Sequence, residues 1–509
     1  METILDYLER TADRYPDREA VDDGVICYTW QRLKERSRQI GSAVAGILGS
    51  ACNPVPVFME KGADTVAAFL GIAYAGSFYI LINPDYPEER IRKLLLILRA
   101  KAAVTEKKLT EKLKKSGFDG TIIEIETVKS GAVRCDLLDE ARARIDSRDY
   151  LYGIFTSGST GVPKNVVVTH QAVIDFIKGF TTIFSFQPED VLANQAPFDF
   201  DVSVKDIYIS VFTGAKLVLI QKEMFTTPPR LLDYLCEKEA TALIWAVSAL
   251  CMLTALRGLE YRIPINVRRV FFSGEVMPMD HLKQWREALP EAEFVNLYGP
   301  TEVTCNCTYY KVTGDENEKD GLPIGQAFPG RQVFLMDQNQ KEIISPGVRG
   351  EICVGGILSS GYYRNSAATE ERFIKCPLEP NHSEIIYRTG DIGYWGAGRQ
   401  LFFAGRKDHQ IKRMGYRIEL EEIEWEIGRI PGVNRVCCLY NHVTKRLTAF
   451  YMGSLNVACI RECVKQKLPY YMVPSAYIWL PLMPLNKNGK IDRSYLQNYA
   501  WKEEKDAKG

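Results

Sequence analysis

The sequence predicts an α/β fold with more than one domain, and this prediction rests on two observations. Apolar runs of strand length alternate with amphipathic helical segments through most of the chain, which is typical of parallel sheets covered by helices. The chain has 509 residues, more than one hydrophobic core usually organises. We therefore expect a large N-terminal domain of helix-covered, mostly parallel sheets with a small β-barrel, followed by a small mobile α+β domain.

The first 300 residues contain the segments that predict the parallel sheets. Strands are expected at 55–60, 78–84, 102–106, 121–126, 214–220, 242–247, 267–274 and 293–299. Helices are expected at 65–76, 87–100, 228–239 and 280–289. The segment 65–84 carries no charge, but it contains glycines and tyrosines and ends in a Pro-Asp-Tyr-Pro turn. A buried helix that leads into a buried strand therefore fits it better than a membrane span.

The pattern changes after about residue 325. Runs at 333–337, 350–356 and 400–405 are separated by turn residues and predict a small antiparallel barrel or sheet. The segment 405–419 is dense in charge and glycine and is interpreted as a linker between domains. A helix at 419–430 and strands at 436–440, 447–453 and 476–481 follow. The expected boundaries are 1–407 for the large N-terminal core and 408–509 for the mobile C-terminal domain.

Composition excludes some classes of function. Lys+Arg and Asp+Glu both number 64, so no overall field favours binding to nucleic acid or to an anionic membrane. The 13 cysteines show no CxxC pair and no Cys/His cluster, which indicates thiols in a reducing cytoplasm rather than a zinc site or disulfides. The N-terminus is charged and amphipathic, unlike a signal peptide.

One loop has the chemistry of a phosphate cradle. The segment 154–164, IFTSGSTGVPK, follows an apolar run and combines hydroxyls, glycines and a lysine. Glycines let backbone N–H groups approach an anion, and the lysine adds positive charge. The Walker pattern is absent, and a plain surface loop is the alternative interpretation.

Further motifs follow in a fixed order. They are NLYGPTE at 296–302, YRTGD at 387–391, the charged segment 405–419 and NKNGKIDR at 486–493. With the loop at 154–164, they resemble the adenylate-forming superfamily of acyl- and aminoacyl-CoA synthetases, luciferases and peptide-synthetase adenylation domains. The segments 194–208, 271–278 and 296–304 look closest to D-alanine:carrier-protein ligases and to stand-alone amino-acid adenylation enzymes.

The resemblance implies a site for ATP and Mg²⁺. Tyr298 would stack on adenine, Thr301 would bind the α-phosphate, and Glu302 would hold the magnesium ion. Asp391 would accept hydrogen bonds from the ribose, supported by Arg406. Lys490 would bridge the substrate carboxylate and the α-phosphate. The full nucleotide set is Thr156, Ser157, Gly158, Ser159, Thr160, Gly161, Lys164, Asn296, Tyr298, Gly299, Thr301, Asp391, Arg406 and Lys490, of which Thr301, Glu302, Lys164 and Lys490 are expected to be catalytic.

Structural interpretations of the same residues stay open. Tyr298 could be a core aromatic, Asp391 a turn cap, and Lys490 a surface lysine. Asn165 stands where the family usually has glycine, and it tolerates a positive φ less freely, so it could constrain the phosphate loop.

The resemblance also implies an amino-acid pocket. Asp201 would bind the substrate ammonium, since a partly buried carboxylate needs a cationic partner. An ion pair with Lys205, four residues later, is the alternative. The remaining pocket positions are Val202, Lys205, Ala246, Phe271, Ser273, Leu297, Cys305 and Asn306. Phe271, Leu297 and Val202 would make the pocket tight, which favours a small substrate. Lys205 raises the alternative of an acidic amino acid or of an internal salt bridge.

The expected reaction is activation of a small amino acid as aminoacyl-AMP, with release of pyrophosphate and transfer to a thiol. Asp408 would be the hinge of the mobile domain, or else a simple cap of the next segment. Sixteen residues follow Arg493, so the acceptor is expected in trans, as a carrier protein with a phosphopantetheine arm or as coenzyme A. Ser273 stands where D-alanine ligases commonly have cysteine, which argues against D-alanine itself. The competing hypotheses are a stand-alone peptide-synthetase enzyme for another amino acid, an acyl-CoA synthetase for a non-amino acid, and a non-catalytic AMP-binding sensor.

Overall fold

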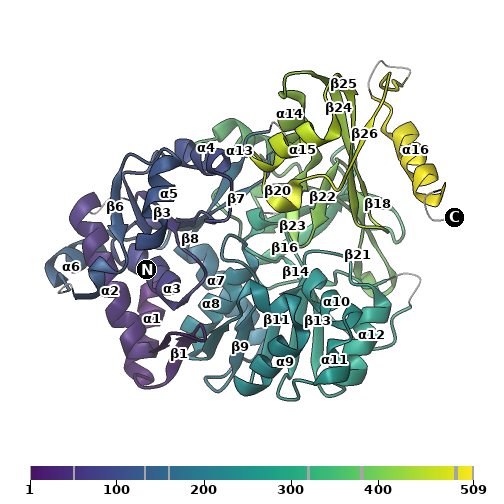
Figure 1. The fold of residues 1–509 in the computed structure, drawn as a ribbon. Coiled ribbons are helices and arrows are strands. Elements are labelled where there is room, and N and C mark those ends of the chain that lie inside the picture. Colours follow the sequence, from purple (N-terminus) through teal and green to yellow (C-terminus); the bar gives the residue numbers. More distant parts are fainter. Residues whose placement is uncertain are drawn as a thin grey trace. The chain divides into compact units, whose positions relative to one another are not determined.

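A computed structural model describes residues 2–49, 52–130, 133–158, 161–317, 321–378, 383–486 and 491–506 (Figure 1). The chain divides into two compact units. The first comprises Met1–Pro84, Leu95–Phe155 and Asn165–Lys407. The second comprises Asp85–Leu94, Thr156–Lys164 and Asp408–Gly509. The second unit therefore contains two short segments from early in the sequence besides the C-terminal hundred residues.

A nine-stranded sheet is the centre of the first unit. Its order is β15-β14-β13-β12-β11-β9-β10-β1-β2, and the pairs from β13 to β1 are parallel. The antiparallel strands β14, β15 and β2 lie at its margins. The strands are β1 Glu19–Asp22, β2 Cys27–Thr29, β9 Val191–Asn194, β10 Lys216–Leu219, β11 Ala242–Ala246, β12 Arg269–Ser273, β13 Glu293–Tyr298, β14 Thr308–Lys311 and β15 Gln326–Ala327.

A second sheet, ordered β6-β5-β3-β4-β7-β8, is parallel from β6 to β7. Its strands are β3 Pro54–Phe58, β4 Phe78–Leu81, β5 Ala102–Thr105, β6 Thr121–Glu124, β7 Tyr150–Thr156 and β8 Lys164–Thr169. The uncharged segment at 65–84 forms most of buried helix α3 (Ala63–Tyr74) and then strand β4, as predicted. In the part of the chain that the structure describes, every helix is too short or too polar to cross a bilayer.

The helices of the first unit cover both faces of the nine-stranded sheet. Alternate residues of its strands face opposite ways: Ile244 and Phe271 join the core shared with α1, α2, α3, α7 and α8, whereas Trp245 and Phe272 join the core shared with α9, α10 and α12. The helices are α1 Ile4–Arg14, α2 Trp30–Leu48, α3, α5 Thr110–Lys115, α6 Cys135–Arg144, α7 His170–Phe184, α8 Val202–Thr213, α9 Pro228–Glu237, α10 Val247–Ala255, α11 Gly258–Tyr261, α12 Met279–Ala288 and α13 Ser366–Arg372.

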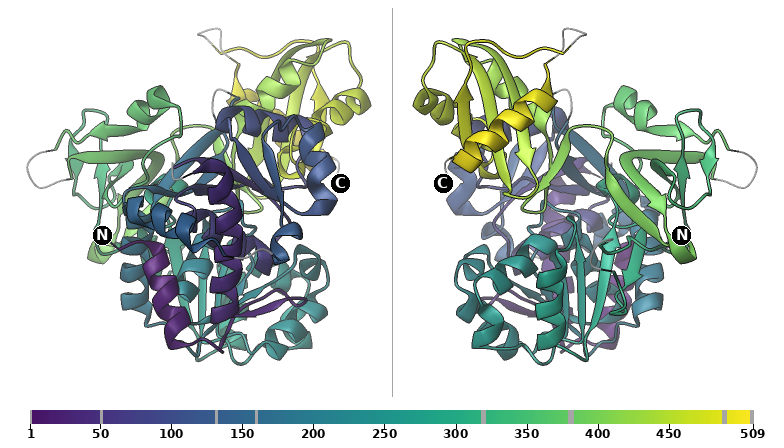
Figure 2. Two further views of the ribbon diagram at one scale, coloured as in Figure 1. Left: turned by 90° about the vertical axis from the view of Figure 1, so that its left-hand side faces the viewer. Right: turned by 90° about the vertical axis from the view of Figure 1, so that its right-hand side faces the viewer.

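Residues 331–406 form an antiparallel sheet, which agrees with the change of pattern in the sequence. Its order is β17-β16-β18-β20-β19, and β21 pairs with β20; Figure 2 shows it in green from two sides. The strands are β16 Arg331–Met336, β17 Glu342–Ile343, β18 Arg349–Gly356, β19 Phe373–Lys375, β20 Ile385–Trp395 and β21 Leu401–Arg406. The overall α/β fold class predicted from the sequence is confirmed.

The second unit is a small α+β body. It contains the hairpin β22 Gln410–Arg413 and β23 Tyr416–Glu419, the sheet β24 Val433–Asn441, β25 Arg446–Gly453 and β26 Ala476–Trp479, and helices α14 Leu420–Gly428, α15 Val457–Lys465 and α16 Arg493–Asp506. The prediction of a linker at 405–419 missed this hairpin, whose turn places Met414 and Gly415 at positive φ. Helix α4 (Glu88–Leu98) begins in this unit and ends in the first.

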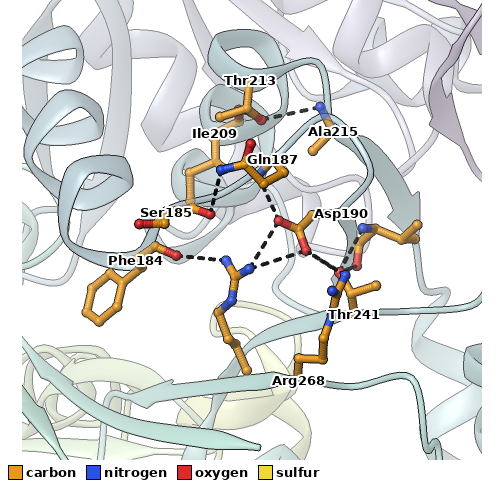
Figure 3. Close-up of polar contacts among 11 residues, drawn as sticks. Phe184, Ser185, Gln187, Asp190, Ile209, Thr213, Ala215, Thr241 and Arg268 are labelled. Atoms are coloured by element: carbon orange, nitrogen blue, oxygen red, sulfur yellow. Dashed lines mark hydrogen bonds and ion pairs between the residues drawn. The ribbon is translucent and has the colours of Figure 1, made fainter.

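The amino ends of the parallel strands are tied together by Asp190. Its buried carboxylate accepts a hydrogen bond from Thr241 Oγ1 at 2.8 Å and lies 3.3 Å from guanidinium nitrogens of both Arg268 and Arg269. Figure 3 shows the carboxylate between Thr241, Arg268 and Gln187, whose backbone N–H also donates to it. Because this network lies at the amino ends of β9, β11 and β12, it stabilises the sheet at the edge opposite the carboxyl ends.

Candidate active site

The strand order of the nine-stranded sheet creates a switch point beside β9. The chain passes from β9 to its neighbour β10 on one side and then to β11 on the other. In open α/β sheets, ligands bind outside the carboxyl ends of the strands where such a reversal occurs. The connection that leaves the carboxyl end of β9 carries Asp201 and leads into α8, so the topology alone directs attention to this position.

Several pocket candidates lie along the same carboxyl edge. Ala246 of β11 pairs with Ser273 of β12, which pairs with Leu297 of β13. Ser273 and Leu297 are both buried. Phe271, two residues before Ser273, is fully buried, and its ring lies 4.8 Å from that of Phe184. Phe271 therefore packs as a core aromatic beneath this row.

The start of α8 is joined to the segment that follows β13. Cys305 Sγ donates to the backbone oxygen of Asp201 at 3.3 Å, and Lys205 Nζ donates to Asn306 Oδ1 at 2.8 Å. Gly299 permits the turn, since a Cβ there would lie 2.6 Å from the Cα of Asn306. The structure thus brings together the residues predicted for the amino-acid pocket from two distant parts of the sequence.

Lys205 is fully buried, and this bears on the alternatives for it. Its hydrogen-bond partner is the neutral amide of Asn306, and none of the described acidic side chains forms an ion pair with it. The helix ion pair between Asp201 and Lys205 is therefore not formed. A buried ammonium with one neutral partner is costly, so this position favours an additional anionic or hydrogen-bond-accepting group.

Cys305 is a packing residue rather than a nucleophile. Burial raises the pKa of its thiol to about 12, with the carboxylate of Asp201 acting in the same direction and the cation of Lys205 opposing it. The thiolate is therefore scarce at neutral pH. Thr304 and Cys305 both have positive φ, and Arg331 Nη2 donates to the Thr304 carbonyl at 3.1 Å, which holds this unusual turn.

Asp391 is held by two partners predicted for the nucleotide site. Its Oδ2 accepts from the Tyr298 hydroxyl at 2.5 Å, and its Oδ1 accepts from Arg406 Nη1 at 2.5 Å. Asp391 and Arg406 are opposite each other on β20 and β21. Burial and the Asp391 carboxylate both raise the pKa of Tyr298, so its hydroxyl stays protonated and donates. Each carboxylate oxygen keeps a second acceptor position, which suits a ribose diol.

Glu302 is oriented by Tyr362. The carboxylate is buried, and its Oε1 accepts from the Tyr362 hydroxyl at 2.8 Å. Thr301 precedes it in the short 3₁₀ helix Thr301–Val303. A hard carboxylate oxygen fixed by a neighbour fits the coordination chemistry of Mg²⁺, which takes one or two protein carboxylates besides phosphate oxygens. Asn296, also buried, instead donates to the carbonyl of Pro323 at 2.8 Å.

The phosphate-loop residues belong to the second unit. Ser157 Oγ donates to the Arg417 carbonyl at 3.0 Å and accepts from the Glu419 N–H at 3.0 Å, so it bridges two residues of β23. Thr156 Oγ1 donates to the Lys164 carbonyl at 3.4 Å. A Cβ at Gly158 would lie 1.9 Å from the Val162 carbonyl, which explains glycine there.

Gly161 has a φ of +77°, and a Cβ there would lie 2.8 Å from the ring of Trp425. Ser159, Thr160 and Lys490 lie outside the described residues, so their predicted roles stay predictions. Asp408 is the first residue of the C-terminal segment of the second unit, and its Oδ1 accepts from the Gln410 N–H at 3.3 Å. This contact fits the cap that was the alternative, and the hinge role stays a prediction.

Asn165 does not strain the backbone. It lies in β8 without a positive φ, so the proposed constraint on the loop does not arise from this residue. Its amide is buried against Gly153, where a Cβ would lie 2.4 Å from Asn165 Oδ1. Glycine at position 153 thus leaves room for the buried Asn165 amide.

Sequence reasoning missed Tyr362, Arg331 and Lys61. Each acts through contacts with residues far away in the sequence: Tyr362 with Glu302, Arg331 with Thr304, and Lys61 with the end of β9. A tyrosine, an arginine and a lysine outside any motif carry no local signal of such roles.

Comparison with known proteins agrees with this geometry. Residues 8–363 match the family model described as AMP-binding enzyme. The chain belongs to this family. The match confirms the resemblance to adenylate-forming enzymes, whereas particular closeness to D-alanine:carrier-protein ligases stays a prediction.

The similar proteins of known sequence include large peptide synthetases. Bacitracin synthase 1 of Bacillus licheniformis is 30% identical over 506 residues, which cover 97% of this chain and 9% of that protein. Tyrocidine synthase 1 of Brevibacillus parabrevis is 29% identical over 502 residues, which cover 97% of this chain and 45% of that protein. The chain thus spans less than half the length of these curated relatives.

A solved structure of similar size also matches. The Vibrio cholerae adenylation domain AlmE, solved with glycyl-adenosine-5'-phosphate, has a TM-score of 0.83 at 21% identity over 98% of this chain and 97% of that one. NpsA-ThdA, an artificially fused adenylation–PCP di-domain from Klebsiella oxytoca, has a TM-score of 0.80 at 20% identity over 94% and 93%. At these identities the structures support the fold alone.

Proposed function

We propose that this chain uses ATP to activate an amino acid as aminoacyl-AMP and then transfers the aminoacyl group to the phosphopantetheine thiol of a carrier protein. The observation that carries the proposal is the junction between α8 and the segment after β13. Contacts of Cys305 with Asp201 and of Lys205 with Asn306 bring the candidate ammonium ligand next to the sequence that contains Glu302.

The first step joins two anions. A carboxylate oxygen of the amino acid attacks the α-phosphorus of ATP, the bond from that phosphorus to the bridging oxygen breaks, and pyrophosphate leaves. Asp201 would bind the substrate ammonium, and Asp391 with Arg406 would orient the ribose. Glu302 would hold Mg²⁺, which would supply positive charge for the phosphate oxygens. Lys490 is proposed to neutralise the reacting carboxylate and the α-phosphate.

The second step is acyl transfer. The thiolate of the acceptor attacks the aminoacyl carbonyl, the bond from that carbon to the phosphate oxygen breaks, and AMP leaves, while the thiol proton passes to solvent. The solved similar proteins include an adenylation–PCP fusion and a domain bound to an aminoacyl adenylate, which supports a carrier protein as acceptor. A carrier on a separate chain, with the second unit as the mobile part and Asp408 as its hinge, belongs to the same proposal.

A small amino acid is the first candidate substrate, and an acidic one is the second. The row of Ser273 and Leu297, with bulky Phe271 packed beneath, favours a short side chain. The second candidate is favoured by Lys205, whose buried ammonium has a neutral partner and would gain an anion from aspartate or glutamate.

An ATP–pyrophosphate exchange panel tests the proposal. Alanine, serine, aspartate and glutamate are assayed in both D- and L-forms, next to fatty and aryl acids. We expect exchange with at least one amino acid and none with the acids that lack an ammonium. Exchange with fatty or aryl acids alone would point to an acyl-CoA synthetase, and ATP binding without any exchange would point to a sensor.

A further inference from the structure

Lys61 is a cation at the carboxyl edge of the nine-stranded sheet that the proposed reaction does not use. It lies between β3 and α3, more than 130 residues before the segments it contacts. Its Nζ donates to the carbonyls of Asn194 at 2.9 Å, of Ile220 at 3.0 Å and of Gln195 at 3.2 Å. Because an ammonium has three donors, these carbonyls occupy all of them.

The three carbonyls belong to the ends of two neighbouring parallel strands. Asn194 is the last residue of β9, Gln195 follows it, and Ile220 follows β10. Strands that end at the same edge leave carbonyls without a partner, and a buried carbonyl without a partner is costly. The Asn194 carbonyl also accepts from the Ile220 N–H at 3.1 Å, and Lys61 adds a second donor there and a donor to each of the other two carbonyls, which fixes the point from which the chain leaves β9.

The connection that leaves this point carries Asp201. It runs from Gln195 to Asp201 and then enters α8. Phe198, in its middle, is buried, and its ring lies 5.7 Å from Lys61 Nζ in a cation–π geometry. Gln195 Oε1 accepts from the Ala246 N–H at 3.2 Å, which ties the same connection to β11 across the switch point.

Asn194 links Lys61, at the start of the connection, to α8, at its end. While its carbonyl accepts from Lys61, its side-chain Nδ2 donates to Asp206 Oδ2 at 2.8 Å. Asp206 lies in α8, is fully buried, and has no hydrogen bond at its Oδ1 from the residues described. The network therefore holds both ends of the connection, one through β9 and one through α8.

The charges of the network depend on each other. Burial lowers the pKa of Lys61 to about 7, and the Asp206 carboxylate opposes this shift. Burial raises the pKa of Asp206 to about 7, opposed by the Asn194 hydrogen bond and by the cations of Lys205 and Lys61. If either group lost its charge, the other would lose an electrostatic attraction that stabilises its own charged form in the interior.

We propose that Lys61, through Asn194 and Asp206, is a positioning residue that sets the place of the Asp201 carboxylate for the substrate ammonium. This inference rests on the proposed function. It assigns no contact between Lys61 and the substrate, since the donors of Lys61 are used by the protein. Its signature is a loss of amino-acid recognition without a loss of ATP recognition.

The test compares two lysine variants of the full chain. Lys61→Met removes the ammonium and keeps the length of the side chain. Lys216→Met is the matched control, because Lys216 is also largely buried in β10 and binds Glu19 at 2.5 Å and Asp22 at 3.0 Å, but at the amino end of the strand. Pyrophosphate exchange gives the KM for the amino acid and for ATP, and thermal unfolding gives Tm.

We expect Lys61→Met to raise the amino-acid KM about 10-fold with little change in the ATP KM, since the misplaced carboxylate loses much of a charged hydrogen bond. Lys61→Arg, which keeps charge and several donors, restores most of the amino-acid KM. Lys216→Met lowers Tm without altering either KM. Asn194→Ala, which keeps the carbonyl but loses the link to Asp206, also raises the amino-acid KM and serves if Lys61→Met does not fold.

Two results overturn the inference while leaving the proposed function intact: an unchanged amino-acid KM in both Lys61→Met and Asn194→Ala, or equal increases of the amino-acid and ATP KM. A wild-type chain that shows no exchange with any amino acid removes the proposed function, and the inference with it. The wild-type panel therefore separates the two failures.

Discussion

Replacement of Asp391 by asparagine tests the nucleotide site most specifically. Asp391→Asn keeps the shape of the side chain but removes its charge and one of its two acceptor oxygens. In the structure these oxygens accept from Tyr298 and from Arg406, each at 2.5 Å, and Asp391 is only 5% exposed. One of the two donors then faces an amide NH₂ group instead of an oxygen.

The size of the effect follows from these contacts. A hydrogen bond to a charged group contributes about 1.5–3 kcal/mol, so the loss of one partner should lower the free energy of unfolding by that amount. If the same carboxylate binds the ribose diol, the weakened acceptor should raise the ATP KM about 10-fold, equivalent to ~1.4 kcal/mol. The amino-acid KM should stay near that of the wild type, because Asp201 is not a partner of Asp391.

Pyrophosphate exchange and urea unfolding measure both quantities. The control is Asp190→Asn, which weakens the comparably buried network of Figure 3 with Thr241, Arg268 and Arg269 at the opposite edge of the sheet. It should lose similar stability at an unchanged ATP KM. An Asp391→Asn variant that is less stable but binds ATP like the control would show that Asp391 only braces β20 and β21, and the ribose assignment would be wrong.

Four further outcomes are expected. Asp201→Ala raises the amino-acid KM by the equivalent of ~1.5–3 kcal/mol, and an unaltered value in the exchange assay rejects the ammonium contact. Lys205→Met reduces exchange with aspartate and glutamate selectively, and an unchanged substrate ranking eliminates the acidic candidate. Lys490→Ala abolishes adenylate formation but spares ATP binding measured by calorimetry; normal rates argue against its role. Burial lowers the pKa of His170 from 6.5 to about 3. As the pH drops from 6.5 to 3, the unfolded chain binds a proton at this histidine and the folded chain does not, so the free energy of unfolding decreases by at most ~1.4 kcal/mol per pH unit. In His170→Gln this dependence, followed by urea unfolding at several pH values, should be shallower, and an identical slope contradicts the assignment.

The parallel sheets were predictable because their strands are local signals. Apolar runs such as 242–247 and 267–274 became β11 and β12, since strands buried on both faces need continuous apolar sequence. The hairpin β22–β23 was missed because its strands are short and rich in charged residues. Where they meet, Arg413 and Met414 interrupt the alternation of apolar and polar residues that would have indicated a strand. Its few apolar residues, Ile411, Tyr416 and Ile418, are nevertheless buried in the folded chain.

The site was predictable only as a set of motifs. Tyr298 and Asp391 were assigned to one nucleotide from a resemblance, and their 2.5 Å contact, across 93 residues of sequence, was not derivable from either motif. Lys205 shows the limit more clearly. Its i+4 spacing from Asp201 made an ion pair the alternative to an ammonium contact, but the structure pairs Lys205 with Asn306, because the tertiary contact of α8 with the segment after β13 decides its partner.

The most direct measurement of the proposed reaction follows oxygen. The amino acid selected by the exchange panel is labelled with ¹⁸O in its carboxylate and incubated with the full chain, ATP, Mg²⁺ and a thiol acceptor. Attack of the carboxylate on the α-phosphorus predicts that one labelled oxygen appears in AMP, detected by mass spectrometry, together with unlabelled pyrophosphate. Unlabelled AMP, or formation of ADP in place of AMP, would contradict an aminoacyl-adenylate route.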